Sequence, residues 1–351
     1  MKIFIEFLKA IVFGLVEGIT EWLPVSSTGH MIILGQFFGF DQTQGKDFFN
    51  FFLVIIQLGA IFAVILTFFK ELWPFGKKKS KSKKKNIWLT WGKILVASVP
   101  AGVIGLLFDD WLDAHLYNYL TVSITLIVYG IFFLVIEGLL RVKARKIKER
   151  YHLNRTAETV IKEDDLDERN LTNYPLFNIQ SVKQITMQYA FIIGLAQVLA
   201  LIPGTSRSGI TICAALLLSI DRKTAAKFSF YLSIPAMLGG SLIKGVMYGI
   251  KIHQGKAAPI TGVQVGLILV AMVVAFSVSW LVITFFMRML RTRTFAAFGI
   301  YRIVFGIVLL VVLYAVNKGN LSTGVSATAL ALTQSDPLLS TIPSFRFRGC
   351  F

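Results

Sequence analysis

The sequence is poor in cysteine, histidine and charge, and each shortage excludes a class of protein. Only Cys213 and Cys350 are present, far apart, so neither a disulfide framework nor a thiolate zinc site is supported. None of the four histidines lies in a His-Glu-x-x-His segment, which excludes that type of zinc site. Charged residues make up 16% of the chain against 55% hydrophobic residues, a balance that excludes a soluble domain of this length.

The apolar residues gather in long uncharged runs. A helix needs about 20 mostly apolar residues to cross a bilayer, and runs of this kind cover residues 48–69, 116–136, 257–287 and 303–317. Two shorter runs, 94–108 and 228–243, can be completed by flanking residues whose charged ends reach the membrane surface. We therefore predict an all-α polytopic membrane protein with about six transmembrane helices. The first apolar segment continues into Glu17 and Glu21 instead of a small-residue cleavage site, so we expect the N-terminus to be retained.

Positive charge exceeds negative charge and clusters beside the apolar runs. Lysine and arginine number 36 against 19 acidic residues, a net charge of +17, and KKKSKSKKK occupies residues 77–85. We interpret this run as a cytoplasmic anchor at the membrane surface and expect no nucleic-acid partner. By the same charge rule we expect residues 141–150 and 288–293 inside the cell and the acidic segment 109–115 outside. Residues 141–169 mix both signs, which is typical of a solvated loop.

The two halves of the chain resemble each other when one is shifted along the other by a constant offset. Ala10, Gly14, Ser26 and Gly29 recur as Ala190, Gly194, Ser206 and Gly209. Because the charge rule threads the halves in opposite directions, we predict an inverted-topology repeat, with chance likeness between apolar segments as the alternative. The expected units are a first repeat at 1–140, a polar cytoplasmic loop at 141–183, a second repeat at 184–318 and a polar tail at 319–351.

Each half begins with an apolar segment that is interrupted by proline, hydroxyl residues and glycine. The interruptions are PVSSTG at 24–29 and PGTSRSG at 203–209, and such clusters break a helix. The flanking pieces of the first are too short to cross a bilayer, which indicates a re-entrant segment. We predict two re-entrant helix-loop-helix hairpins that enter from opposite faces. Their tips must lie in protein or line a wet cavity, and the repeat axis would bring them together.

Ionisable groups lie near both tips and need partners inside a membrane. Arg207 is within the second tip, and Glu17 and Glu21 lie four residues apart before the first, on one face if that segment is helical. A charge at membrane depth costs about 2.5–3.5 kcal/mol on insertion scales, so we expect the three to share one pocket. Two carboxylates on one face suit a divalent cation or an acid/base pair. The alternative is a purely structural ion pair of one glutamate with Arg207.

Small hydroxyl residues crowd both tips and favour an anionic ligand. The first tip has Ser26, Ser27 and Thr28 before Gly29, and the second has Thr205, Ser206 and Ser208 before Gly209. Where a helix restarts, such hydroxyls and the following backbone N–H groups can form an anion-binding nest, although helix capping alone also accounts for them. Arg207 can hold phosphate oxygens through two parallel hydrogen bonds. Two nests with one arginine predict a diphosphate ligand.

His30 lies three residues after Ser27, about one helical turn. This spacing puts the imidazole within reach of a nucleophilic hydroxyl as a general base. A lone histidine is more often simply hydrogen-bonded, but the hydroxyl, acidic and arginine neighbours favour a catalytic role. We predict Ser27 as nucleophile with His30 or Glu21 as proton acceptor, and His30 as the nucleophile is the alternative.

Together these residues resemble those of a known family. EGITEWLPVSSTGH at 17–30 and PGTSRSG at 203–209 are similar to motifs of the undecaprenyl-diphosphatases, the bacitracin-resistance type of bacterial membrane phosphatase, and the resemblance covers about residues 5–316. It implies hydrolysis of undecaprenyl diphosphate to the monophosphate that carries cell-wall precursors. It also implies a divalent cation, Mg²⁺ or Ca²⁺, and a site open to the outer face of the bacterial plasma membrane.

The resemblance also assigns residues by position. It implies that Glu17 and Glu21 are the acidic pair, that 26–30 is the hydroxyl and histidine cluster, and that 206–208 is the phosphate-binding tip. The lysine run, the stretch 141–182 and the tail 319–351 depart from the pattern. A rival function is a flippase for polyprenyl phosphate, since secondary transporters also use inverted repeats with broken helices. Isoprenoid length, metal preference and oligomeric state, a homodimer included, are left open.

Overall fold

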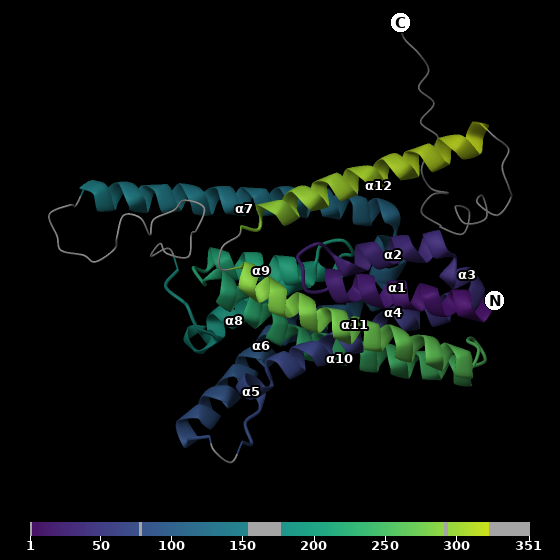
Figure 1. Ribbon diagram of the computed structural model, residues 1–351, viewed down its shortest axis with the longest axis horizontal. Coiled ribbons are helices and arrows are strands. Elements are labelled where there is room, and N and C mark those ends of the chain that lie inside the picture. The colour runs from purple at the N-terminus through teal and green to yellow at the C-terminus, as the bar shows by residue number, and fades with distance from the viewer. Residues whose placement is uncertain (1, 77–78, 154–176, 291–293, 323–351) are drawn as a thin grey trace, which may run out of the picture.

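The structure is a computed structural model that describes residues 2–76, 79–153, 177–290 and 294–322, and in these segments it is helical without named strands (Figure 1). The helices of the first half are α1 (Lys2–Thr20), α2 (Ser27–Phe38), α3 (Phe40–Gln44), α4 (Lys46–Thr67), α5 (Phe69–Leu72), α6 (Lys81–Leu116) and α7 (Tyr119–Leu153). Those of the second half are α8 (Met187–Val198), α9 (Arg207–Leu217), α10 (Arg222–His253), α11 (Gly262–Met289) and α12 (Ala296–Ser322), with short 3₁₀ turns at Val182–Gln184 and Leu199–Leu201.

Six of the described helices are long and apolar enough to cross a membrane, namely α4, α6, α7, α10, α11 and α12. This confirms the predicted all-α polytopic membrane protein and its six crossings. The helices are longer than the uncharged runs because polar residues at their ends continue the helical hydrogen bonding. The pairs α1–α2 and α8–α9 are shorter and enclose the two predicted interruptions.

Some polar stretches that we expected as loops are helical. Residues 141–153 continue α7, and residues 81–85 of the lysine run form the first turn of α6. Both stretches are rich in lysine and arginine and lack proline and glycine, so helix propensity extends the helix beyond the apolar span. The rest of the expected loop, 154–176, the basic residues 291–293 and the tail from 323 onward lie outside the described residues.

Equivalent helices of the two halves pack against each other in opposite directions. At the start of α4, Asp47 pairs with Lys251 near the end of α10 at 2.7 Å, and Glu71 in α5, which follows α4, pairs with Lys227 near the start of α10 at 2.9 Å. The start of each long helix therefore lies beside the end of the other. The helices α7 and α12 form a second antiparallel pair at the top of Figure 1, where the neighbours of Gly130 include Ile303 and those of Gly306 include Ser123. Antiparallel counterparts are what an inverted repeat requires.

The first helix of each hairpin packs on a long helix from the other half. A Cβ atom at Gly14 of α1 would lie 2.5 Å from the carbonyl oxygen of Ala271 in α11, and one at Gly194 of α8 would lie 2.2 Å from that of Ala97 in α6. Only glycine permits so close an approach, which explains why glycine occupies both of these equivalent positions of the repeat. Because α1 packs on a helix of the second half and α8 on a helix of the first, both tips lie in the interior of the bundle.

Candidate functional site

Both hairpin tips have the same local backbone. Ser26 and Ser206 each adopt a left-handed φ of 72°, after which α2 and α9 begin. The hydroxyl oxygen of Ser26 accepts from the amide of Gly29 at 3.4 Å, and that of Ser206 accepts from the amide of Gly209 at 3.2 Å. Both serines therefore cap the helices that follow. The amides of the two glycines are engaged within the tips, and a phosphate nest formed by the other hydroxyl and amide groups stays a prediction.

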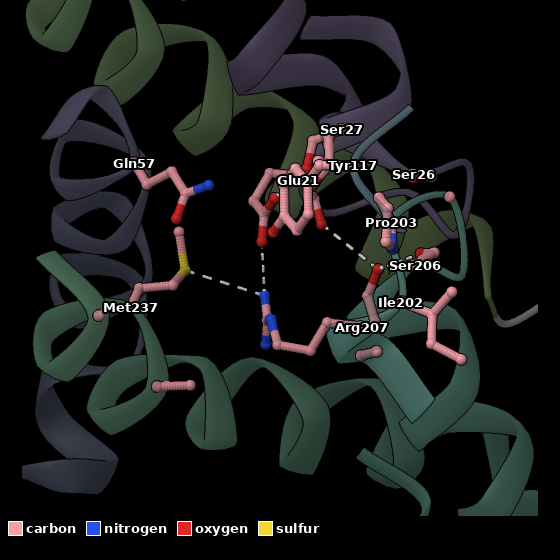
Figure 2. A pocket seen from close by; sticks show the side chains of 16 residues that line it. Glu21, Ser26, Ser27, Gln57, Tyr117, Ile202, Pro203, Ser206, Arg207 and Met237 are labelled. Carbon is pink, nitrogen blue, oxygen red and sulfur yellow. Dashed lines mark hydrogen bonds and ion pairs between the residues drawn. The ribbon is translucent and has the colours of Figure 1, made fainter. Parts of the chain in front are cut away.

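The two tips meet, as the repeat predicted (Figure 2). Arg207 in the second tip donates from Nη2 to Oε1 of Glu21 at 2.7 Å. The hydroxyl of Ser208 lies 3.3 Å from the carbonyl oxygens of both Glu21 and Leu23. These contacts join residues about 185 positions apart in the chain. Of the three ionisable residues that we expected to share one pocket, Glu21 and Arg207 do so, whereas Glu17 is not among the residues of the cavity wall.

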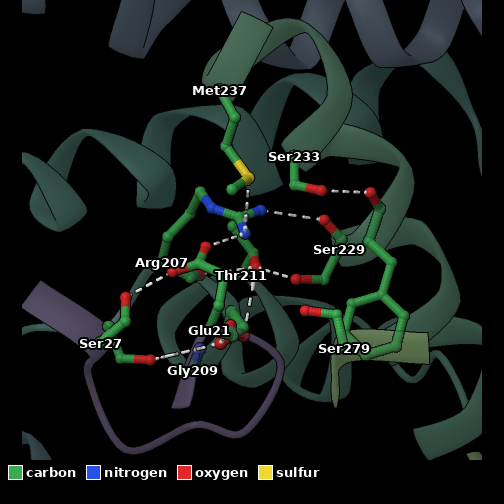
Figure 3. Close-up of polar contacts among 12 residues, drawn as sticks. Glu21, Ser27, Arg207, Gly209, Thr211, Ser229, Ser233, Met237 and Ser279 are labelled. Carbon is green, nitrogen blue, oxygen red and sulfur yellow. Dashed lines mark hydrogen bonds and ion pairs between the residues drawn. The ribbon is translucent and has the colours of Figure 1, made fainter. Parts of the chain in front are cut away.

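Glu21 also holds the predicted nucleophile. The hydroxyl of Ser27 donates to Oε2 of Glu21, while Oε1 binds Arg207 (Figure 3). Both Glu21 and Ser27 are buried, and a carboxylate in a dry site is a strong hydrogen-bond acceptor. The Ser27 hydroxyl and the Arg207 guanidinium are thereby aligned on one carboxylate, which can itself accept the hydroxyl proton.

Arg207 is fixed by hydrogen bonds within the second half. Its Nη1 donates to the carbonyl oxygen of Ser229 at 3.3 Å, and the hydroxyl of Ser229 pairs with that of Thr211 at 2.7 Å. Thr211 in turn donates to the carbonyl oxygen of Arg207 at 2.8 Å. These three residues close a ring that sets the direction of the guanidinium (Figure 3).

A cavity of about 180 Å³ lies at the junction of the tips. The predicted site residues in its wall are Glu21, Ser26, Ser27, Thr28, Ser206, Arg207 and Ser208. Among the wall residues that sequence reasoning missed are Gln57, Met237 and Tyr117 (Figure 2). A signal was present for the first two, because Gln57 is a polar residue inside an uncharged run and Met237 occupies the equivalent position in the second half.

Glu17 is fully buried and both of its carboxylate oxygens lack a hydrogen-bond partner. The amide of Glu21 donates to the carbonyl oxygen of Glu17 at 3.0 Å, so a helical turn connects them and puts both side chains on one face. Among the described residues no group of three or more His, Cys, Asp or Glu side chains gathers to hold a metal ion. Two carboxylates nevertheless suit Mg²⁺, which commonly takes one or two carboxylates together with substrate phosphate oxygens and water.

The structure does not bring His30 to Ser27. Its Nδ1 lies 2.7 Å from the carbonyl oxygen of Ser26, and its Nε2 lies 2.7 Å from the hydroxyl of Tyr301. Because a carbonyl oxygen only accepts, Nδ1 carries a proton, and in the neutral ring Nε2 accepts from Tyr301. The ring also stacks on Phe305 at 4.4 Å. The helical spacing was right, but both ring nitrogens are engaged away from the cavity.

The remaining predicted residues, Thr205, Gly29 and Gly209, lie within the tips, and the two glycines pack against α7. The hydroxyl of Thr205 is buried without a hydrogen-bond partner. A Cβ atom at Gly209 would lie 2.5 Å from the ring of Phe133 in α7, and one at Gly29 would lie 3.1 Å from Val122. These two glycines let the tips pack closely against α7.

Proteins of a known family resemble the chain over most of its length. The family described as bacitracin resistance protein BacA matches residues 10–308. The chain is 42% identical over 308 residues to the undecaprenyl-diphosphatase of Enterococcus faecalis, covering 88% of this chain and 98% of that protein. It is 41% identical over 307 residues to undecaprenyl-diphosphatase 1 of Oenococcus oeni, covering 88% and 96%. It is also 42% identical over 308 residues to the undecaprenyl-diphosphatase of Streptococcus mutans, covering 88% and 96%.

Proposed function

The chain belongs to the bacitracin resistance protein BacA family, and we propose that the cavity between its hairpin tips is where it hydrolyses undecaprenyl diphosphate. It is an undecaprenyl-diphosphatase, a membrane hydrolase that recycles the lipid carrier of cell-wall synthesis. The observation that carries the proposed site is the carboxylate of Glu21, which accepts from both Ser27 and Arg207. Groups for attack, proton transfer and phosphate binding therefore lie at one point.

In the first step, Ser27 attacks the terminal phosphorus of the substrate. A bond forms between its Oγ and phosphorus as the bond from phosphorus to the bridging oxygen breaks, and undecaprenyl phosphate leaves. The hydroxyl proton passes to Oε2 of Glu21, which already accepts it as a hydrogen bond. A positioned carboxylate of this kind is a typical general base for a hydroxyl nucleophile.

Arg207 binds the terminal phosphate and stabilises the charge that spreads over its oxygens during transfer. When a phosphate takes the guanidinium, Glu21 gives up its ion pair with Arg207, at present 2.7 Å long. Loss of the guanidinium by itself raises the proton affinity of the carboxylate, and Oε2 keeps its hydrogen bond from Ser27.

In the second step, water attacks the phosphoserine and the bond between phosphorus and Oγ breaks. Glu21 returns its proton to Oγ of Ser27, and both protons of the attacking water leave with the inorganic phosphate. The same carboxylate thus serves as base in one step and as acid in the next.

We further propose that Glu17 and Glu21 hold a divalent cation, Mg²⁺ or Ca²⁺. The support is the buried and unpartnered carboxylate of Glu17. When bound, such a cation neutralises negative charge on the phosphate groups. A chelator should then lower phosphate release and added Mg²⁺ should restore it, whereas unchanged release in chelator would contradict this cation site.

We propose that the site opens to the outer face of the bacterial plasma membrane, with both hairpins re-entrant. Tyr117, in the turn after α6, lies in the cavity wall, and it is at the opposite end of α6 from the lysines at 81–85. Lysine-rich ends lie on the cytoplasmic side, which puts the mouth outside. The prenyl chain would lie between helices, and a homodimer stays a prediction.

The rival function, a flippase for polyprenyl phosphate, is not favoured. The relatives are named as diphosphatases, and a transporter has no use for the hydrogen bond that prepares Ser27 for attack. Headgroup movement across liposomes that survives Ser27→Ala would revive the flippase, because transport does not require the nucleophile.

The decisive variant for the proposed site is Ser27→Ala. The purified chain should release phosphate from undecaprenyl diphosphate, and the variant should lose at least about 100-fold in kcat because the nucleophile is gone. Ser277→Ala is the matched control, since the Ser277 hydroxyl bonds only to its own helix at Val273. Turnover in Ser27→Ala within threefold of the parent chain would exclude Ser27 as nucleophile.

A further inference from the structure

Arg302 of α12 bridges the two hairpin tips from behind the cavity. Its side chain is fully buried. Nη2 donates to the carbonyl oxygen of Gly204 at 2.7 Å, and Nη1 donates to that of Pro24 at 3.3 Å. The guanidinium fork therefore ends on the backbone of both tips at once.

The two carbonyl groups occupy equivalent places in the repeat. Pro24 and Gly204 are separated by the same offset that relates the two halves of the chain. Pro24 precedes Ser27 by three residues, and Gly204 precedes Arg207 by three. One guanidinium thus fixes, at matching points, the segments that carry the nucleophile and the phosphate-binding arginine. Gly204 also has a left-handed φ of 91°, and a Cβ atom there would lie 2.0 Å from Thr125 Oγ1, so the second carbonyl is firmly placed.

Within the described residues, no acidic side chain forms an ion pair with Arg302. Its guanidinium donates to the two carbonyl groups and lies over the rings of Phe133 at 5.1 Å and Tyr129 at 5.9 Å. Its Nε is buried without a hydrogen-bond partner. The equally buried Arg222 shares this feature, since its Nε also lacks a partner, but it has a counter-ion, because Glu137 accepts from it through two hydrogen bonds of 2.8 and 3.0 Å. A buried cation without a counter-ion is costly, so its presence needs an explanation beyond packing.

The other strong contact between the tips cannot hold them throughout the reaction. The ion pair of Arg207 with Glu21 uses the two groups that the substrate phosphate and the Ser27 proton need. When phosphate takes Arg207, this contact opens, and alignment of the tips depends on bonds that the chemistry does not consume. The contacts of Arg302 are of that kind, because its acceptors are main-chain carbonyls. The uncharged hydroxyl of Ser208, 3.3 Å from the carbonyl oxygens of Glu21 and Leu23, also stays available, but a charged donor makes the stronger hydrogen bond.

We propose that Arg302 is a positioning residue that clamps the two tips. It keeps Ser27 in place to attack the same phosphate group that Arg207 binds throughout turnover. The proposal rests on the function proposed above. Tyr301, the residue before it, adds a second tie from α12, since its hydroxyl bonds to His30, which bonds to the carbonyl oxygen of Ser26. Helix α12 therefore orients both tips without touching the substrate.

The test compares Arg302→Met, which has no donor, with Arg302→Lys, which keeps a charge and a donor but loses the fork. The matched control is the double variant Arg222→Met with Glu137→Gln, which removes an equally buried arginine and the charge of its partner but keeps an acceptor for the amide of Phe295, now 2.9 Å from Oε1 of Glu137. Each purified full-length variant is assayed for kcat and KM by phosphate release, and hydrogen exchange is followed by mass spectrometry in peptides from 20–30 and 202–209.

For Arg302→Met we expect kcat to fall at least about tenfold with KM within threefold, because small misplacements of reacting groups mainly raise the barrier. Exchange should accelerate in both tips and not in α4 or α10. Arg302→Lys should recover part of kcat, and the control should keep kcat within about twofold and leave exchange in the tips unchanged.

Two results would overturn the clamp. One is normal kcat with unchanged exchange in the tips for Arg302→Met, and the other is an equal loss of kcat in the control, which would indicate a general effect of removing a buried arginine. If Arg302→Met does not fold, Arg302→Lys with normal kcat and tip exchange contradicts the clamp in the same way. Activity in the parent chain and its loss in Ser27→Ala separate failure of the clamp from failure of the proposed function.

Discussion

At the scale of single residues, Glu21 is the point at which the two halves of the chain meet. One carboxylate oxygen accepts from the Ser27 hydroxyl and the other from Arg207. Before substrate binds, the carboxylate keeps the nucleophile and the cation aligned and offsets the charge of Arg207. In the proposed mechanism, phosphate binding releases the carboxylate to act as a base. Under that proposal the same group stabilises the empty site and takes part in the reaction.

Ser229 should affect turnover through Arg207 although it is not in the cavity wall. Its hydroxyl pairs with Thr211, which bonds back to the main chain of Arg207. Ser229→Ala removes one buried hydrogen bond, typically about 0.5–1.5 kcal/mol, and we expect kcat to fall by about two- to tenfold. Ser233→Ala, one turn further along α10 with its hydroxyl bonded to Phe230, should leave kcat within twofold. Equal kcat values for the two variants would contradict the positioning role of Ser229.

Residues whose chemistry conflicts with a membrane were the ones that the sequence predicted best. Glu21 and Arg207 had to be paired because lipid does not accept isolated charges. The same rule would have found Arg302, which stands directly before the uncharged run 303–317. Its acceptors could not be predicted, because they are main-chain carbonyl groups and do not depend on residue type. The direction of the His30 ring could not be predicted either, because it depends on Tyr301, 271 residues away.

At the scale of helices, glycine sets how deeply the hairpins enter the bundle. Gly194→Ala places a methyl group against the Ala97 carbonyl oxygen, where the distance would be 2.2 Å. Overpacking of this kind costs about 1–3 kcal/mol, so we expect a lower temperature of thermal unfolding in detergent. Gly239→Ala in α10 is the control, because its Cβ atom would meet nothing within 4 Å. An unchanged unfolding temperature for Gly194→Ala would show that α8 and α6 can move apart without loss of stability, and it would contradict the need for glycine at this position.

The antiparallel pair α4 and α10 shows how charge distinguishes the halves. Asp47 and Lys227 occupy equivalent positions of the repeat, as do Glu71 and Lys251. The acid of each ion pair belongs to the first half and the base to the second, so the ion pairs form only between unlike halves. Two copies of the same half would oppose like charges at both ends. These pairs are partly exposed, so their contribution is to orientation more than to stability.

Helix ends were the elements that the sequence predicted least well. The uncharged runs located the spans, since apolar length is dictated by bilayer thickness. They could not locate residues 141–153, where a sequence rich in lysine and arginine continues the helix beyond the apolar span. The tips were predicted because proline and glycine break helices for local reasons.

At the scale of the whole molecule, the orientation in the membrane can be measured directly. In a Cys350→Ser background, where the remaining Cys213 is buried, Asp47→Cys should react with an impermeant thiol reagent added to intact cells. Lys83→Cys should react only after the membrane is opened, because lysine-rich ends are cytoplasmic. The opposite labelling would place the cavity mouth on the cytoplasmic side and contradict the outward-facing site.

The central claim is that groups from both halves act on one phosphorus atom, and a single-turnover measurement tests it most directly. Substrate labelled in its terminal phosphate is mixed with excess protein and quenched within milliseconds, and the labelled residue is identified. We expect phosphoserine at Ser27, formed at least about tenfold more slowly in Arg207→Lys because the fork that binds phosphate is lost. Label on His30 would contradict Ser27 as the nucleophile, and an unchanged rate in Arg207→Lys would contradict a shared site at the two tips.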